Sequence, residues 1–498
     1  MKNFLLLSLL LTLASNPTAW AQKIPGASPE KHIRFLASDE LMGRMTGTAG
    51  NNQAADYIAA HFKKQGLMPV PGTEGYFQKV YLQKTTPPQS ASITLNEQIF
   101  RLSEHFIVLQ GAAIDQELPW VFAHYGWEDD TRNDYANLDV KGKVVICKMG
   151  ASDETDPREA LQLIRLKRDL ALKNGAAALI EIYNAPYPWP IISRYFGGSS
   201  QYELAEEENA ASALSFLWLN DPEKTLTSAL ETQKQGTLRL QSGGMLIEKV
   251  ASQNVIGMLE GKDPLLKKEY IFLSAHYDHV GGGTNTGSGG AMTPEDSIYN
   301  GARDNAMGTT AVLEAAAYFA KKRPARSLVF IAYTGEELGL LGSKYYAQNP
   351  LIPFKDVVYN FNCDGAGYND KTKVTVIGLE RTNAQALILQ GCKENGLEAI
   401  VDPVPEQNLF DRSDNVSFAE KGVPAPTFAP GLTAFDEAIQ QYYHQVADDA
   451  DSLDFVYVAQ YANAYVRSAE LIANFKEKFK WAEGDKYEKA YQSLYGTN

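Results

Sequence analysis

Short apolar runs alternate with amphipathic segments through the second half of the chain, from Val250 onward. The runs "EYIFLSAH", "SLVFIAY" and "DVVYNFNC" are apolar and rich in β-branched or aromatic residues, as buried strands should be. Between them, Asp304–Ala320 and "LGLLGSKYYAQN" have helical patterns, and Asp304 stands at a capping position. Strands that alternate with helices predict an α/β fold whose central sheet is mostly parallel and carries helices on both faces.

The first half begins with a helical pattern over Lys31–Leu67 and changes character near residue 115. "GKVVICKMG", a helix over Arg158–Asn174 and "AAALIEIYN" then form a compact βαβ-like unit. The aromatic, proline-broken segment Asn184–Tyr202 is too long for a plain connection, so it is either a solvated loop or a lid or wall beside a substrate. We expect the following division: a main domain over 22–115 and 250–483, a small inserted α/β or β-rich domain over 116–249, and a loose polar tail over 484–498.

The N-terminus is typical of a secretory signal. Lys2 precedes an apolar run over Phe4–Leu13, and Ala19-Trp20-Ala21 fits a small-x-small cleavage site. The run is too short to span a bilayer, which needs about 20 apolar residues. We expect a signal peptide over residues 1–21, cleavage after Ala21, no membrane span, and a secreted or periplasmic protein.

Net charge and cysteine content exclude one class of partner and one class of fold. The net charge of −14 argues against nucleic acid as a partner, because binding a polyanion needs basic patches. The three cysteines do not make a disulfide framework. Cys147 lies in an apolar run and should be buried, and a single Cys363–Cys392 bridge is possible.

Hydrophilic residues follow three of the apolar runs directly, where ligands bind in open α/β sheets. "HYDH", from His276 to His279, follows the first run; Glu336 and Glu337 follow the second; Asp364 follows the third. Histidine and carboxylate side chains gathered at one sheet edge suit zinc or a similar divalent ion, although the ligand types do not exclude cobalt or manganese. Asp278 lies two residues from His276, within reach to orient its ring.

Five ordered motifs make the chain resemble the co-catalytic zinc aminopeptidase family that also contains glutamate carboxypeptidases and the transferrin-receptor ectodomain. They are "SAHYDHVG", "NGARDNAMGT", "TGEELGLLGS", "NFNCDGAG" and "YYHQVADD". "LASDELMGRMTGTAGNNQAADYIAAHFKKQGL" is similar to the N-terminal segment of the family. "GKVVICKMG…NGAAALIEIYN" is similar to the protease-associated domain often inserted in it.

The resemblance implies two divalent metal ions, Zn²⁺ in this family, and a role for each matching residue. Asp304 bridges the two metals, His276 and Asp364 complete one ligand set, and Glu337 and His444 complete the other. Glu336 is then the general base, and a cis peptide follows the bridging residue. Two ions about 3.5–4 Å apart can share a water and make it hydroxide near neutral pH. Tyr443 is placed to donate to the oxyanion, so Glu336, Tyr443 and Asp278 are the expected catalytic residues.

One motif departs from the family. "FDRSDNVSFAEKGVPAPTF" has Asn415 where a histidine is common, so we do not count this position as a ligand. Arg412 and Asp414 of this loop are candidate substrate contacts, with a salt bridge within the loop as the alternative.

The best-supported function is a secreted exopeptidase, most simply an aminopeptidase acting on peptides, because acidic groups suit a free amine and no arginine cluster lies near the motifs. A carboxypeptidase or dipeptidase, a glutaminyl cyclase and a non-catalytic binding ectodomain are the alternatives. Loss of catalysis would predict replaced ligands, whereas every matching residue is present. The sequence leaves the oligomeric state open.

Overall fold

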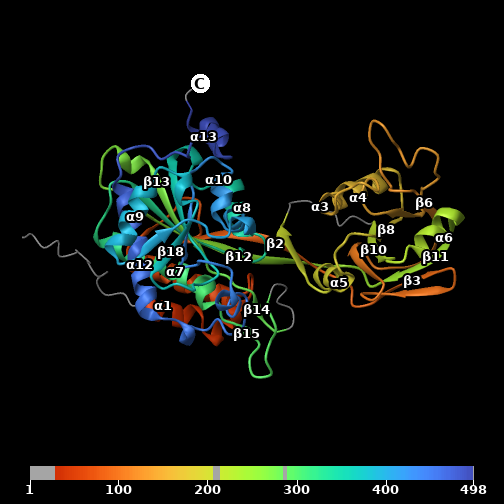
Figure 1. The fold of residues 1–498 in the computed structure, drawn as a ribbon, viewed down its shortest axis with the longest axis horizontal. Coiled ribbons are helices and arrows are strands. Elements are labelled where there is room, and N and C mark those ends of the chain that lie inside the picture. The colour runs from red at the N-terminus through yellow and green to blue at the C-terminus, as the bar shows by residue number, and fades with distance from the viewer. Residues whose placement is uncertain (1–28, 206–213, 284–288, 497–498) are drawn as a thin grey trace, which may run out of the picture.

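Two lobes connected by a pair of long strands make up the molecule (Figure 1). The computed structural model describes residues 29–205, 214–283 and 289–496, so the expected signal peptide lies outside the described residues. The connecting strands are β2 (Phe77–Thr86) and β12 (Leu246–Leu259), antiparallel partners from Phe77–Val255 to Thr86–Leu246. No helix of the described residues is both long and apolar enough to cross a membrane.

The larger lobe is built on a mixed sheet of ten strands among the described residues, in the order β19-β18-β20-β17-β13-β16-β12-β2-β9 with β1 beside β12. The four central strands, β20, β17, β13 and β16, are parallel, and the pairs outside them include antiparallel ones. The remaining bounds are β1 Met68–Pro69, β9 Gln201–Leu204, β13 Tyr270–His276, β16 Ser327–Tyr333, β17 Val357–Cys363, β18 Lys373–Ile377, β19 Glu398–Ile400 and β20 Thr427–Pro430.

Helices cover both faces of this sheet, as predicted. One face packs against α1 (Pro29–Leu36), α2 (Ala49–Lys64), α7 (Met307–Lys321), α9 (Gln385–Glu394) and α12 (Phe455–Asn474). The other packs against α8 (Leu341–Gln348), α10 (Asn415–Ala419) and α13 (Glu488–Tyr495). In β16, Phe330 faces the first set and Ile331 the second, which explains why these strands are apolar throughout.

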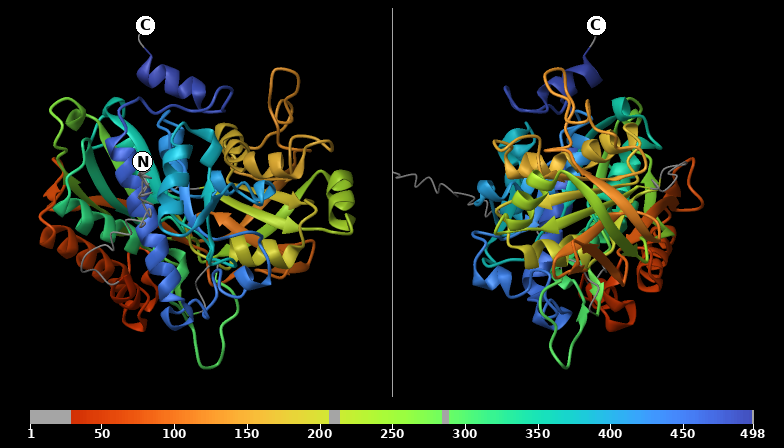
Figure 2. Two further views of the ribbon diagram at one scale, coloured as in Figure 1. Left: turned by 60° about the vertical axis from the view of Figure 1, so that its left-hand side comes forward. Right: turned by 90° about the vertical axis from the view of Figure 1, so that its right-hand side faces the viewer.

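The smaller lobe, seen end-on in the right-hand view of Figure 2, has its own sheet in the order β4-β3-β11-β6-β7-β8-β10-β5. One buried core lies on each side of it. The strands are β3 Ala91–Leu95, β4 Gln98–Arg101, β5 Phe106–Gln110, β6 Ile114–Phe122, β7 Val144–Lys148, β8 Ala178–Tyr183, β10 Ser215–Asn220 and β11 Gln235–Ser242. Its helices are α3 Pro157–Gln162, α4 Ile164–Lys173, α5 Trp189–Gly197 and α6 Thr225–Gln233.

The change of sheet comes earlier than the expected boundary at residue 115. The strands β3, β4 and β5 all belong to the smaller sheet, because β3 pairs with β11 and β5 with β10. The smaller sheet therefore begins at Ala91, while β9, from within the expected insert, pairs with β2 of the larger sheet. Strand pairing is non-local, so a change in local composition does not locate it.

Several expected elements differ locally. The helical pattern over Lys31–Leu67 is interrupted at Asp39–Arg44, where Met42 and Gly43 have positive φ. The expected helix at Asp304 begins at Met307, because Asp304 and Asn305 have non-helical φ and ψ. Leu163 separates α3 from α4, and Asn184–Tyr202 contains α5 and the start of β9.

The prediction that residues 484–498 form a loose tail is also wrong for the central part of that segment. It contains α13, and Tyr487, Tyr491 and Leu494 pack on the core that covers one sheet face. The Tyr495 hydroxyl donates to the Val357 carbonyl of the sheet. Three aromatic residues in a polar segment supply the apolar surface that fixes it.

The three cysteines are free and buried, so Cys147 lies as expected and the possible Cys363–Cys392 bridge does not form.

Candidate metal centre

The C-terminal ends of the central strands bring the predicted site residues together. His276 ends β13, Glu336 and Glu337 follow β16, and Asp364 follows β17. Because these strands are parallel neighbours, their ends meet at one edge of the sheet. Asp304 enters from a turn over Ala302–Ala306, and His444 from the loop after α11 (Glu437–Gln440).

Asp304 lies between two clusters and presents one carboxylate oxygen to each. Its Oδ1 is 3.3 Å from His276 Nε2, which is also 3.1 Å from Asp364 Oδ1. Its Oδ2 is 3.3 Å from His444 Nε2, which is also 3.1 Å from Glu337 Oε2. The peptide bond between Asp304 and Asn305 is cis, as expected.

These contacts define two groups of potential metal ligands that share Asp304. One holds His276, Asp304 and Asp364; the other holds His279, Asp304, Glu337 and His444, and the ligand atoms of each lie within 4.8 Å of one another. Ligand atoms 3.1–3.3 Å apart match the spacing of about 3.3 Å between neighbours in a tetrahedral site with bonds of about 2.0–2.1 Å. Imidazole and carboxylate donors suit zinc, so the residues fit two divalent metal ions.

The adjacent glutamates have separate environments. Glu337 belongs to a ligand group, whereas Glu336 does not, and Glu336 Oε2 approaches His276 Nε2 only to 4.0 Å. Burial raises the pKa of Glu336 well above its ordinary value, and the nearby carboxylates of Asp364 and Glu337 add to this against the effect of His276. Burial alone would raise the pKa of Glu337 too, but His444 and His279 hold it at about 2.

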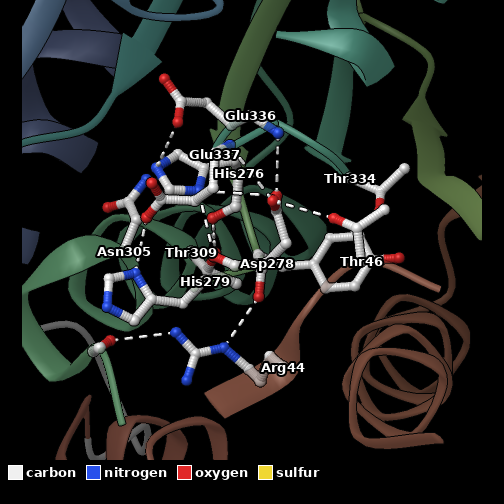
Figure 3. A network of polar contacts seen from close by, with 12 residues as sticks. Arg44, Thr46, His276, Asp278, His279, Asn305, Thr309, Thr334, Glu336 and Glu337 are labelled. Carbon is white, nitrogen blue, oxygen red and sulfur yellow. Dashed lines mark hydrogen bonds and ion pairs between the residues drawn. The ribbon is translucent and has the colours of Figure 1, made fainter. Parts of the chain in front are cut away.

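The Asp278 carboxylate binds the turn that carries both glutamates (Figure 3). Its carboxylate accepts from the backbone N–H groups of Glu336 at 3.2 Å and Glu337 at 3.3 Å, and from the Thr46 hydroxyl at 3.1 Å. His276 Nδ1 lies 3.2 Å from the Asp278 backbone carbonyl and 3.7 Å from its carboxylate. The carboxylate of Asp278 therefore orients the glutamate turn, while its carbonyl orients the His276 ring.

A buried arginine from the N-terminal segment supports the same edge. Arg44 donates to the Tyr277 carbonyl at 2.8 Å, the Asn300 carbonyl at 2.5 Å and the Gly301 carbonyl at 3.1 Å. It thus connects the residue after His276 to the turn that carries Asp304. The glycine before it, Gly43, has a φ of 66°, and a Cβ there would lie 2.2 Å from the Gly281 carbonyl oxygen.

Asp448 joins the loop of His444 to the turn of Asp304. Its carboxylate accepts from the backbone N–H of Arg303 at 2.9 Å, from that of Asp304 at 3.3 Å, and from the Arg303 guanidinium at 3.0 Å. The Arg303 guanidinium stacks over the Tyr442 ring at 3.6 Å. The "YYHQVADD" motif therefore supplies both a ligand and the clamp that positions the bridging carboxylate.

The side chains of the "DRSDN" loop lie in different environments. Ser413 donates to Asp364 Oδ2 and accepts from Asn362 Nδ2 at 2.8 Å, which orients the Asp364 carboxylate. Asp414 is fully buried and is not among the residues that line the pocket beside the site, so its burial gives no support to the expected substrate contact; burial raises its pKa to about 7. The Asn415 side chain donates to the Ala425 carbonyl.

Arg412 does line that pocket, and its Nη2 donates to the Tyr443 hydroxyl at 3.3 Å. The Tyr443 ring stacks on the His444 ring with centroids 4.1 Å apart. Burial raises the pKa of the Tyr443 hydroxyl to about 12. The pocket beside the ligand groups has an apolar part, lined by Ile377, Leu409, Ala429, Leu432 and Phe435.

Sequence reasoning missed His279, Arg44, Thr46 and Asp448. His279 is buried, and its Nδ1 lies 2.7 Å from Glu337 Oε1, so it donates to the oxygen that does not face His444. Its place in "HYDH", after the same strand as His276, was the available signal. Arg44 and Thr46 had none beyond the resemblance of their segment to the family, and Asp448 only its place in the last motif.

Comparison with known proteins identifies the domain. Residues 254–467 match Peptidase family M28. The aminopeptidase YwaD of Bacillus subtilis (strain 168) is 26% identical over 490 residues, which cover 94% of this chain and 92% of YwaD. A vacuolar membrane protease of Saccharomyces cerevisiae is 30% identical over 181 residues, only 36% of this chain and 16% of that protein. An aminopeptidase from Aneurinibacillus sp. strain AM-1 has a similar fold, with a TM-score of 0.56, 19% identity, and coverage of 91% of this chain and 94% of that one.

The fold and site define a metal-dependent hydrolase. Residues 254–467 match the family of peptidases that the sequence motifs indicated, and the predicted resemblance, fold class and enzyme class are confirmed. The predicted cofactor of two divalent metal ions is confirmed, while the assignment of individual ligands stays a prediction that the two groups sharing Asp304 support. The assignment of the smaller lobe as a protease-associated domain stays a prediction.

Replacing His279 by alanine is expected to weaken metal binding by about 10- to 100-fold, because Glu337 loses the hydrogen bond that turns Oε2 toward His444. Competition with a chromophoric chelator measures this. His279→Asn, whose amide can replace the ring donor, is expected to lose less. His105→Ala, in the smaller lobe, is the matched control and should bind metal as the wild type does. Unchanged affinity in His279→Ala would show that Glu337 does not need this partner.

Proposed function

We propose that the protein is a zinc aminopeptidase that acts outside the cytoplasm and releases apolar residues from the N-termini of peptides. The observation that carries this proposal is the pair of ligand groups sharing Asp304, with Glu336 beside them and outside both. The similarity to the aminopeptidase YwaD over most of both chains supports the reaction type. The export signal proposed for residues 1–21 supports the location.

The chemistry of the pocket favours a substrate with a free amine. Asp304, Glu336, Glu337 and Asp364 all line it, and of these only Glu336 lies outside both ligand groups, so its carboxylate is the one left free to contact an ammonium group. The apolar part lined by Ile377, Leu409, Ala429, Leu432 and Phe435 suits an aliphatic or aromatic side chain on the residue that bears this amine. We therefore expect leucine-like N-terminal residues to be preferred over charged ones.

The chain's own residues perform the proton transfers. When bound, the two metal ions supply an acidified water and a Lewis acid for the scissile carbonyl. Glu336 accepts the proton of the attacking water and later gives it to the leaving amine. Tyr443 donates its hydroxyl hydrogen bond to the carbonyl oxygen as negative charge develops there. Asp278 holds Glu336 in place through its backbone N–H.

A panel of leucyl peptides blocked at either end tests the proposal. We expect hydrolysis of the C-terminally amidated peptides and of leucine p-nitroanilide, and none of the N-acetylated peptides, because the acetyl group removes the ammonium charge. Chelator-treated enzyme is the control: activity should disappear and return with zinc. Cleavage of N-acetylated peptides would instead indicate a carboxypeptidase.

A further inference from the structure

Arg412 is a positively charged side chain beside the pocket that contains the two ligand groups. It ends a short helical turn over Leu409–Arg412 and is solvent-exposed at the pocket wall. It is the one lysine or arginine among the described residues that line the pocket, which also includes Asp304, Glu336, Glu337 and Asp364. Its guanidinium therefore stands where a substrate group can reach it.

This guanidinium has no carboxylate partner among the described residues, although charged neighbours on the same face do. Asp411, the residue before it, pairs with Lys486 at 2.6 Å, and Arg381 pairs with Asp485 at 2.7 Å. The hydrogen bond that Arg412 makes goes to the neutral hydroxyl of Tyr443. A guanidinium has five N–H donors, so most of the hydrogen-bonding capacity of Arg412 is available to a ligand in the pocket.

The position of Tyr443 fixes which part of a substrate lies near Arg412. If Tyr443 donates to the scissile carbonyl at about 2.8 Å, the Nη2 atom at 3.3 Å from that hydroxyl lies within about 6 Å of the same carbonyl oxygen. One residue spans about 3.3–3.6 Å of extended chain. The next main-chain carbonyl group on the leaving side of the scissile bond is therefore within reach of the guanidinium.

We propose that Arg412 forms an anion subsite for the free C-terminal carboxylate of a dipeptide, so that the enzyme favours dipeptides over longer or C-terminally blocked peptides. This inference rests on the proposed aminopeptidase function. In a dipeptide, the group one residue beyond the scissile bond is a carboxylate, and arginine binds it with charge-assisted, bidentate hydrogen bonds. In a longer peptide, the same position holds a neutral amide carbonyl, which accepts a weaker bond.

The test compares leucyl-glycine with leucyl-glycinamide, which differ in that terminal charge. We expect replacement of Arg412 by methionine to lower kcat/KM for leucyl-glycine by about 5- to 20-fold, since the contact is charged but solvent-exposed. Its kcat/KM for leucyl-glycinamide and for leucine p-nitroanilide, which lack the carboxylate, should fall by a smaller factor, so the ratio of kcat/KM for leucyl-glycine to that for leucyl-glycinamide should fall. Taking the ratio of the two peptides in each variant cancels the difference in basicity of their leaving amines.

Two controls separate charge from structure. Arg412→Lys keeps the charge and should retain part of the preference, whereas Lys486→Gln removes a nearby charge that pairs with Asp411 and should leave the ratio unchanged. An equal loss on both peptides in Arg412→Met would overturn the inference and assign Arg412 to positioning Tyr443. A ratio that the substitution does not alter would also overturn it. Failure of the wild type to hydrolyse leucine p-nitroanilide would instead refute the aminopeptidase function.

Discussion

Glu336→Gln is expected to lower kcat by about 10²- to 10⁴-fold while the enzyme keeps both metal ions. Glutamine has the shape of glutamate but cannot accept and return a proton. Glu336 lies outside both ligand groups, so its carboxylate is not needed to hold metal. Its backbone N–H, bound by Asp278, is unaffected by the substitution. Steady-state hydrolysis of leucine p-nitroanilide gives kcat, and elemental analysis of the dialysed protein gives metal content.

The adjacent residue supplies the matched control. Glu337→Gln is expected to lose metal, because Glu337 Oε2 is 3.1 Å from His444 Nε2 within a ligand group. The two substitutions are chemically identical and one position apart, so the contrast depends only on the direction each side chain takes. Metal loss in Glu336→Gln with retention in Glu337→Gln would reverse the two assignments.

Asp304→Asn is expected to abolish activity by removing metal from both groups, leaving less than about half of the wild-type content. Both oxygens of Asp304 are used, one beside His276 and one beside His444. An amide offers one oxygen and no negative charge, so neither group keeps its shared ligand. His444→Ala should remove metal mainly from one group, because His276 and Asp364 do not depend on it.

Elemental analysis and circular dichroism after dialysis together check this prediction. Glu314→Gln is the control, since Glu314 is a fully buried carboxylate of α7 that belongs to neither ligand group. It should keep both metals and the native spectrum. An Asp304→Asn enzyme that retains two metals would show that Asp304 does not bridge them.

The central strands and the residues at their ends could be predicted because both signals are local. An apolar run such as "SLVFIAY" marks a strand, and the polar residues directly after it mark the sheet edge. Arg44 and Thr46 could not be predicted because their partners beside the site, Tyr277 and Asp278, lie more than 200 positions away, and a buried arginine that binds carbonyls has no local signature. The burial of Asp414 could not be predicted for a similar reason: aspartate usually lies at a surface, and the burial of this residue depends on tertiary packing at the start of α10. The sheet to which β3–β5 belong could not be predicted for the same reason, because the strands that pair with them lie far away in the sequence.

The site draws on both halves of the chain, and this has a consequence for biosynthesis. Arg44 binds the sheet edge that carries the ligand groups, whereas His444 and Asp448 join this edge from some 400 positions later in the sequence. A growing chain that ends before His444 lacks one ligand, and one that ends before Asp448 lacks the clamp on the bridging carboxylate. The site is therefore expected to assemble only after the segment that carries His444 and Asp448 has been synthesised and has packed against the sheet edge, so a translation product truncated before His444 lacks part of the ligand set.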